Sequence, residues 1–258
     1  MSLISFSIDH HVARIVLQRP EKLNSFNREM ALALQTALDE CAANQSIRAV
    51  YLTGAGKGFS AGQDLAEVTD PEGPGMDIIL REHYNPIVRH IRALPKPVLA
   101  AVNGVAAGAG ANIALCCDVV VAAASASFVQ AFSRIGLIPD SGGTYFLPRL
   151  IGWQKASALM MLGDKIPAPE AEKMGMIYQV IPDESFAEQS WQLALKLSQL
   201  PTRGLALTKE ALQQSFTQTL EQQLGTEDLL QQKAARTVDY KEGIQAFLEK
   251  RAPLFRGE

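Results

Sequence analysis

Hydrophobic and polar residues alternate at the start of the chain in a pattern typical of β-strands. Residues 3–8 and 12–17 each alternate, and the polar run Asp9-His10-His11 separates them, so this segment is predicted to form a β-hairpin. In residues 28–43 the apolar positions recur at helical spacing instead, and Asn27 precedes them as a suitable N-cap. The chain is therefore expected to begin with two strands and a helix.

Short apolar runs of strand length follow this helix and are separated by glycine-rich loops. They cover residues 47–52, 97–102 and 119–123, and the small-residue segment 108–117 between the last two has a helix-like pattern. Helical spacing dominates the C-terminal part of the chain, with one more strand pattern at 177–181. The helices predicted there cover 153–162, 185–200, 203–216, 220–236 and 241–249.

These patterns indicate an α/β fold followed by a helical region. No linker or low-complexity tract interrupts the chain, so we divide it into an α/β core at residues 1–200 and a helical region at residues 201–258. The second part has an apolar stripe but many Gln residues, and it cannot bury itself alone. We expect it to pack on the core and on neighbouring subunits; a local cap on its own core is the alternative.

The composition is that of a globular protein and restricts the classes of partner. Of 258 residues, 47% are hydrophobic and 20% are charged, which argues against disorder, and a net charge of −3 argues against nucleic-acid binding. Polar residues interrupt the longest apolar stretch, 97–124, so no membrane span is expected. The three Cys residues form no CxxC pair and the start shows no secretory pattern, so we expect a cytoplasmic protein.

Two glycine-rich loops, residues 54–64 and 103–112, are the candidates for chemistry. Neither has the spacing of a P-loop, and Phe59 and Ile113 occupy the positions where a dinucleotide-binding loop needs its third glycine. We therefore expect no nucleotide cofactor. The His residues show no metal-ligand partners, so no metal is expected either.

Loops of this kind expose main-chain donors. Each follows a strand pattern and precedes a predicted helix, where backbone N–H groups are free, and Gly and Ala allow a ligand to approach closely. Two such loops that converge on one oxygen would form an oxyanion hole. From spacing alone, ordinary tight turns between layers remain the alternative.

Four segments of this sequence resemble signatures of the crotonase (enoyl-CoA hydratase/isomerase) superfamily. They are residues 19–25 (RPEKLNS), 59–65 (FSAGQDL), 103–110 (NGVAAGAG) and 138–144 (IPDSGGT). The resemblance implies a spiral of ββα units, with a helical C-terminal region that forms trimers, and trimers that often pair into hexamers. It also implies a coenzyme A thioester as substrate and no separate cofactor.

The same resemblance assigns the site residues. The N–H groups of Gln63 and Ala109 would bind the thioester oxygen as the oxyanion hole. The substrate and its CoA portion would be bound by Lys22, Ala61, Asp64, Leu65 and Gly108. Lys22 would meet a CoA phosphate, although an exposed surface Lys is an equal alternative, and Asp64 could instead be a solvated or capping residue.

The acid and base groups of a hydratase of this family are missing. Such hydratases carry two Glu residues, and here the first position is Asn112 while the second falls in the segment 130–132, which reads Gln-Ala-Phe in place of Gln-Pro-Glu. One carboxylate remains in a matching segment, Asp140. A single base suits isomerisation better than hydration, so Asp140 is the predicted catalytic residue; a helix N-cap is its alternative role.

The segment around Asp140 resembles a subgroup, the 2-(1,2-epoxy-1,2-dihydrophenyl)acetyl-CoA isomerases of phenylacetate breakdown, which carry an Asp at this place. The sequence therefore predicts an acyl-CoA isomerase that converts a ring epoxide to an oxepin. An aliphatic enoyl-CoA isomerase, a CoA-ester hydrolase and a non-catalytic assembly subunit are the alternatives. Phe132, Tyr145 and Phe146 would suit an aromatic acyl group or the core, and help from Glu82 or His83 stays open.

Overall fold

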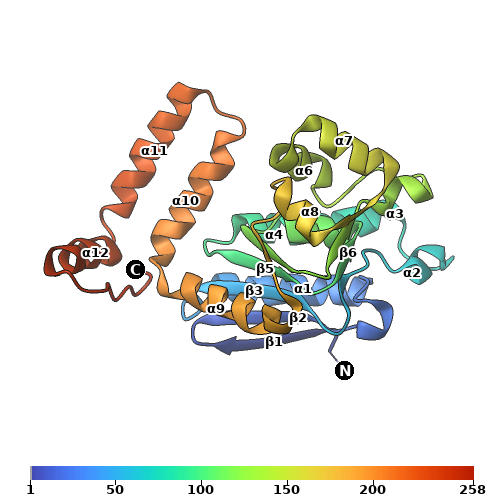
Figure 1. Cartoon of the computed structure of the whole chain (residues 1–258), viewed down its shortest axis with the longest axis horizontal. Coiled ribbons are helices and arrows are strands. Elements are labelled where there is room, and N and C mark those ends of the chain that lie inside the picture. The colour runs from blue at the N-terminus through green and yellow to red at the C-terminus, as the bar shows by residue number, and fades with distance from the viewer. Residues whose placement is uncertain (1) are drawn as a thin grey trace.

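The computed structural model describes residues 2–258, and its strands form two sheets that the helices surround (Figure 1). The larger sheet has the strand order β1-β2-β3-β5-β7-β10 and the smaller one the order β4-β6-β8-β9. The strands of the larger sheet are β1 (Ile4–Asp9), β2 (Val12–Leu17), β3 (Ala49–Gly54), β5 (Val98–Val102), β7 (Val119–Ala123) and β10 (Gln179–Ile181). Those of the smaller sheet are β4 (Gly58–Ser60), β6 (Val105–Ala107), β8 (Ser127–Val129) and β9 (Lys165–Pro167).

The N-terminal hairpin forms as predicted. Strands β1 and β2 pair antiparallel, with Ile4 opposite Leu17 and Asp9 opposite Val12. The two turn residues, His10 and His11, have φ values of 46° and 65°, which is the backbone of a two-residue turn that matches strand twist. From β2 onward the larger sheet is parallel, and β3 and β5 are buried along their whole length, as expected of strands covered on both faces.

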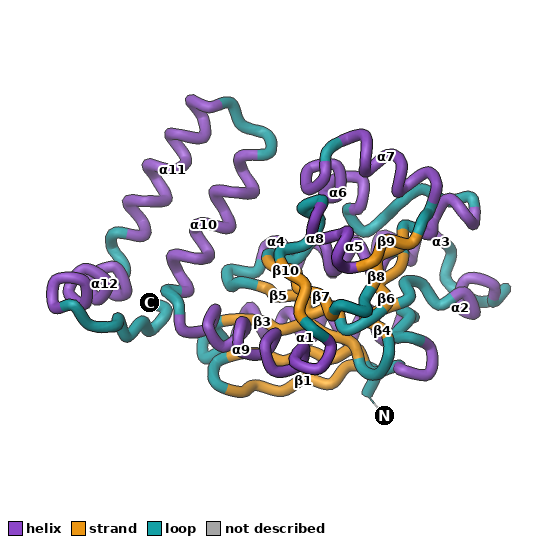
Figure 2. Tube along the Cα trace, viewed as in Figure 1, coloured by secondary structure: helices purple, strands orange, loops and turns teal. Residues whose placement is uncertain are grey.

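The chain winds between the two sheets as a spiral. Strand β3 is followed by β4, β5 by β6 and β7 by β8, so each turn adds one parallel strand to each sheet (Figure 2). This arrangement confirms the predicted α/β spiral. The smaller sheet itself was not predicted, because its strands are three residues long and too short for alternation to be read.

The helices of the core lie between the strands along the chain. Helix α1 (Arg28–Ala43) begins as predicted, with Asn27 Oδ1 accepting from Met30 N at 3.0 Å. The remaining helices of the core are α2 (Leu65–Thr69), α3 (Met76–Ile78), a π-helical turn (Ile79–Tyr84), α4 (Asn85–Ala93), α5 (Ala109–Leu115), α6 (Gly143–Ile151), α7 (Trp153–Leu162), α8 (Ala168–Lys173) and α9 (Phe186–Gln199). Three short 3-10 segments complete them, at Pro20–Lys22, Ala131–Ile135 and Asp183–Ser185.

Three C-terminal helices project from the rest of the molecule (Figure 1): α10 (Thr202–Ser215), α11 (Leu220–Ala234) and α12 (Val238–Glu249). Helix α10 is attached to the core by the buried Lys209, whose Nζ donates to Asp118 Oδ2 at 2.8 Å and to Ile91 O at 2.7 Å. The predicted division at residues 200 and 201 falls just before α10, and its status as a domain boundary stays a prediction. None of the helices in residues 2–258 is long and apolar enough to cross a bilayer.

Candidate active site

The two glycine-rich loops meet at the start of helix α5. Gly62 has a φ of +87°, and a Cβ placed there would lie 2.7 Å from Ala107 O and 3.3 Å from Ala109 N. Gly110 is equally close to the other loop, since its Cβ would lie 2.6 Å from Ser60 O. The main chains are therefore in direct contact, and a side chain at either glycine would separate them.

Gln63 and Ala109 present free main-chain N–H groups at this junction. The amides around Gln63 are paired, with Ala61 N donating to Leu23 O at 2.9 Å and Asp64 N donating to Phe26 O at 2.8 Å. Neither Gln63 N nor Ala109 N donates to an acceptor in residues 2–258. Two free donors on loops in contact are what an oxyanion hole requires. That they bind a thioester oxygen stays a prediction.

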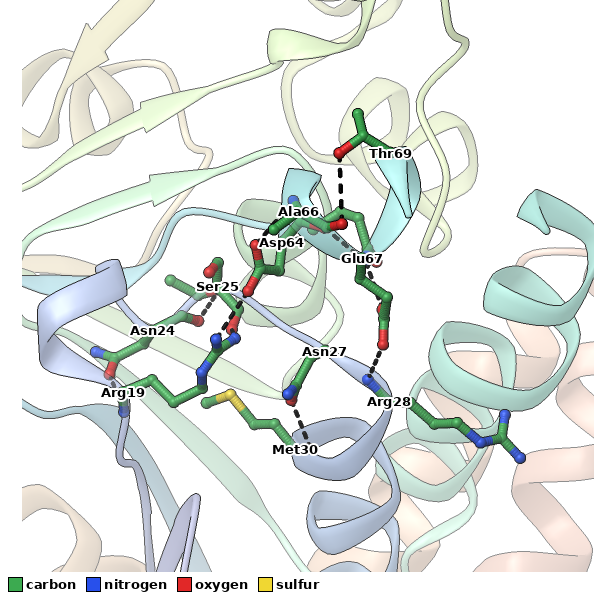
Figure 3. A network of polar contacts seen from close by, with 12 residues as sticks. Arg19, Asn24, Ser25, Asn27, Arg28, Met30, Asp64, Ala66, Glu67 and Thr69 are labelled. Carbon is green, nitrogen blue, oxygen red and sulfur yellow. Dashed lines mark hydrogen bonds and ion pairs between the residues drawn. The ribbon is translucent and has the colours of Figure 1, made fainter. Parts of the chain in front are cut away.

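The side chain of Gln63 is anchored on both sides. Its Oε1 accepts from the Tyr84 hydroxyl at 2.6 Å, and its Nε2 donates to Glu67 Oε2 at 2.8 Å. Glu67 in turn accepts from the main-chain N of Arg28 at 2.7 Å through Oε1 (Figure 3). Burial raises the pKa of the fully buried Tyr84 well above its usual value, so the phenol stays a neutral donor. No sequence pattern marked Tyr84, which lies on the π-helical turn.

Asp64 is fixed by an ion pair with the first signature segment. Arg19 Nη2 lies 2.8 Å from Asp64 Oδ2, and Arg19 Nη1 donates to Ser25 O at 2.6 Å (Figure 3). The other carboxylate oxygen of Asp64 accepts from Ala66 N at 3.1 Å and caps α2. Burial alone would raise the pKa of Asp64, but hydrogen bonds from Arg19 and Ala66 and the Arg19 charge outweigh it and lower that pKa. The capping role, foreseen as the alternative, is thus observed.

Four further residues were predicted to contact the substrate or its CoA portion. Lys22 and Leu65 are exposed, while Ala61 and Gly108 are partly buried next to the two free amides. Lys22 is close enough for its charge to help lower the pKa of Asp64. Their contacts with a substrate stay predictions.

Asp140 lies in the turn before α6 and does not cap that helix. The N-cap position is Gly142, and no side chain accepts from the first amides of α6. The predicted alternative of an N-cap is therefore wrong. The Asp140 carboxylate is partly buried, and its protein contact is the Ser141 hydroxyl, which donates to Oδ1 at 2.9 Å.

Burial raises the pKa of Asp140 to about 6, and the hydrogen bond from Ser141 offsets part of the effect. The Asp140 charge also contributes to the raised pKa of Tyr84, so these two groups share one region of the molecule. Asp140 is also held against α5, the helix that begins at Ala109, because its main-chain O accepts from Asn112 Nδ2 at 2.9 Å.

Comparison with known proteins decides the family. The family model described as enoyl-CoA hydratase/isomerase matches residues 7–258. This chain belongs to the enoyl-CoA hydratase/isomerase, or crotonase, family. It is 49% identical over 261 residues to the 1,2-epoxyphenylacetyl-CoA isomerase of Escherichia coli (strain K12), with 100% of both chains covered.

Other relatives in this family carry hydratase names. A Rhodobacter capsulatus protein named "Probable enoyl-CoA hydratase" is 45% identical over 255 residues, with 98% of each chain covered. The crystal structure of an enoyl-CoA hydratase from Bacillus anthracis matches with a TM-score of 0.92 and 35% identity, covering 99% of this chain and 100% of that one. The fold and the enzyme family are therefore shown, and the reaction type has to be argued from the site.

The two positions of the hydratase glutamates hold no acid in this crotonase-family member. Asn112 is buried, and its side chain hydrogen-bonds within the protein, to Asp140 O and Gln130 Nε2. Phe132 is buried beside the second glycine-rich loop, since a Cβ on Gly108 would lie 3.8 Å from its ring. A neutral amide and an apolar ring thus occupy these positions.

Four side chains whose roles the sequence left open make contacts within the protein. Glu82 pairs with Arg28 at 2.7 Å, and His83 is buried with its Nε2 3.1 Å from Arg28 Nη1. The ring of Tyr145 packs edge-on against Phe216 of the C-terminal region, with ring centroids 5.7 Å apart. Phe146 is partly buried under the Asp140 turn, 2.8 Å from where a Cβ on Gly142 would lie.

A groove lies elsewhere on the molecule. It has a volume of about 1230 Å³ between α4, α10 and the C-terminal residues, and Lys96, Lys209 and Gly257 border it. Gln63, Ala109 and Asp140 do not line it. We place the site at the free amides and the carboxylate, because a reaction needs those groups more than it needs volume. Residues 2–258 contain no cluster of His, Cys, Asp or Glu side chains that could hold a metal ion.

Proposed function

We propose that this protein is an acyl-CoA isomerase that acts on an enolisable thioester, with Asp140 as its catalytic base. The observation that carries the proposal is the state of Asp140. It is a partly buried carboxylate with a pKa of about 6, and its main-chain O is hydrogen-bonded to Asn112 on α5, the helix that begins with the free amide of Ala109. A carboxylate tuned in this way can both accept and return a proton near neutral pH.

In the proposed mechanism the thioester oxygen accepts hydrogen bonds from Gln63 N and Ala109 N. As carbon 2 loses its proton, negative charge moves onto that oxygen, and the two fixed dipoles stabilise it. Asp140 takes the proton and returns it at another carbon of the conjugated system. The substrate keeps all its atoms, so neither water nor a redox partner is consumed.

Hydration is disfavoured by the same site. Adding water needs one group to activate the water and one to protonate carbon. The two positions that would supply them hold the amide of Asn112 and the ring of Phe132, and neither transfers a proton near neutral pH. A lone carboxylate suits proton movement within one substrate.

We further propose the ring epoxide of phenylacetyl-CoA as substrate and an oxepin as product. Support comes from the 49% identity to a protein of that name and from Phe132, an apolar ring beside the second glycine-rich loop that suits an aromatic acyl group. The CoA portion would lie against the exposed Lys22 and Leu65 and the partly buried Ala61, Asp64 and Gly108.

The test incubates purified protein with 2-(1,2-epoxy-1,2-dihydrophenyl)acetyl-CoA and with aliphatic enoyl-CoAs and follows the products by mass spectrometry. We expect a product of unchanged mass from the epoxide. With heavy water as solvent, we expect deuterium at the carbon that receives the proton, or at carbon 2 of recovered substrate. A gain in mass of one water would indicate a hydratase, release of free CoA a hydrolase, and no exchange with any ester an inert subunit. Each of these results would contradict the proposal.

The matched variant is Asp140→Asn, which keeps the shape of the side chain and removes the base. We expect kcat to fall by about 10²–10⁴-fold, the usual contribution of a positioned acid or base. KM for the CoA ester should change little. Asp77→Asn, at an exposed Asp, is the control and should keep wild-type kcat. Wild-type turnover by Asp140→Asn would remove Asp140 from the mechanism.

A further inference from the structure

The Asp140 turn is held through its main-chain carbonyl. Asp140 O accepts from Gly143 N at 2.8 Å and from Asn112 Nδ2 at 2.9 Å. Between Asp140 and Gly143 the chain reverses through Ser141 and Gly142, whose φ values are +52° and +77°. For Ser141 a positive φ costs conformational free energy, so this turn needs outside support.

Asn112 supplies that support from helix α5. Its side chain is 1% exposed and fits closely against Gly143, where a Cβ would lie 2.3 Å from Nδ2. Its Oδ1 accepts from Gln130 Nε2 at 2.8 Å. Gln130 follows strand β8 and is 4% exposed. Two buried amides thus connect β8, α5 and the Asp140 turn.

The direction of these hydrogen bonds is fixed by chemistry. A main-chain carbonyl only accepts, so Asn112 must turn its NH₂ toward Asp140 and its oxygen toward Gln130. Gln130 must then present its own NH₂ to Asn112. The remaining oxygen of Gln130 is buried and has no hydrogen-bond partner in residues 2–258. The Asp140 carbonyl thus sets the direction of both hydrogen bonds.

We propose that Gln130 is a positioning residue, which acts through Asn112 to hold the Asp140 carboxylate at its place relative to the free amides of Gln63 and Ala109. The inference rests on the proposed function of Asp140. Gln130 itself contacts neither the carboxylate nor the free amides; its NH₂ donates to Asn112 Oδ1 and strengthens the amide orientation that the Asp140 carbonyl requires. A turned amide would place its oxygen against Asp140 O, and the repulsion would move the turn.

The test replaces Gln130 by Met, which has nearly the same shape and no donor. We expect kcat to fall about 10–100-fold, as a misplacement near 1 Å does, while KM stays within about twofold. Tm should not fall, because the substitution also removes the unpaired oxygen. Ser127→Ala, at a buried hydroxyl on β8 that likewise has no partner in the described chain, is the matched control and should keep wild-type kcat. Wild-type kcat in a folded Gln130→Met variant would overturn the proposal.

A second variant, Gln130→Glu, covers the case in which Met does not fold. A carboxyl at this position donates to Asn112 only while protonated. Its kcat should therefore fall as the pH rises, opposite to the rise that ionisation of Asp140 produces in the wild type. A pH profile parallel to that of the wild type would contradict the proposal.

Crystal structures separate this proposal from the proposed function. In Gln130→Met the Asp140 carboxylate should shift relative to Gln63 N and Ala109 N, whether or not any acyl-CoA is turned over. If the wild type is inactive but the carboxylate shifts in the variant, only the isomerase proposal is contradicted. An unmoved Asp140 would sink the positioning role alone.

Discussion

Asp140 needs to be ionised to remove a proton, yet its burial favours the protonated form. Burial raises its pKa to about 6, so the carboxylate is mostly charged at pH 7 and mostly protonated at pH 5. We expect kcat/KM to be nearly constant from about pH 7 to 8 and to fall about tenfold per pH unit below 6. A pH profile of the initial rate measures this, and a midpoint near 4 would mean that Asp140 is more solvated than the structure has it.

The raised pKa of Asp140 also affects the stability of the folded protein. Because the folded pKa lies above the ordinary value of 3.8, the folded state binds this proton more tightly than the unfolded state. Asp140 therefore destabilises the fold as the pH rises from about 4 to 6, and Asp140→Asn should unfold at higher urea concentration above pH 6. The difference should vanish below about pH 4. Equal urea midpoints for the two proteins at pH 7.5 would contradict this.

Tyr84 acts on the site through Gln63. Its hydroxyl is the donor to Gln63 Oε1, and the ring is 1% exposed, packed edge-on against Phe26. Tyr84→Phe keeps the ring and removes one hydrogen bond, worth about 1 kcal/mol. We expect kcat to fall a few-fold, because the loop that carries the Gln63 N–H loses one anchor. Steady-state kinetics measure this fall in kcat, and Tm is measured on the same variant. A lower Tm with unchanged kcat would limit Tyr84 to a structural role.

At the scale of elements, the site depends on contact between the loop at 61–64 and the start of α5. That contact exists because Gly62 has no side chain. Gly62→Ala would place a methyl group 2.7 Å from Ala107 O and impose a φ of +87° on a residue that resists it. We expect a large loss of kcat, on the order of 10²-fold or more, since both oxyanion donors are displaced.

A glycine without such contacts is the control for this prediction. Gly225 lies inside α11, and a Cβ there meets nothing within 4 Å. Gly225→Ala should keep kcat and raise helix stability by roughly 0.5–1 kcal/mol. If Gly62→Ala keeps full activity, the junction is not the oxyanion site.

At the scale of the whole molecule, the C-terminal helices show large exposed apolar side chains. Among them are Leu220, Leu229, Phe247 and Leu248, of which Phe247 is 82% exposed, and the exposed Leu254 follows the last helix. A monomer gains nothing by projecting such residues into water, so we propose a trimer or a pair of trimers that buries them.

Light scattering after gel filtration tests the proposed assembly. We expect the wild type to have three or six times the chain mass of 28.0 kDa. Phe247→Glu should shift it toward smaller species, while Ile8→Glu, at an exposed residue of the hairpin, should not. A monomeric wild type would leave the C-terminal helices as a cap on their own core.

Much of the fold and part of the site could be predicted from the sequence, because their determinants are local. The hairpin follows from alternation around His10 and His11, and α1 follows from its apolar spacing and the cap at Asn27. Gln63 and Ala109 were predicted from the resemblance of residues 59–65 and 103–110 to family signatures, and the structure leaves both N–H groups free; their oxyanion role stays a prediction.

The tertiary structure decided what depends on distant residues. Short strands β4, β6, β8 and β9 form only because each finds a neighbour in the smaller sheet. Tyr84 reaches Gln63 from a π-helical turn that no periodic pattern marks, and the amides of Asn112 and Gln130 meet only when the segment after β8 folds against α5. The raised pKa of Asp140 comes from burial, which is a property of the packed molecule; the sequence supplied only the carboxylate.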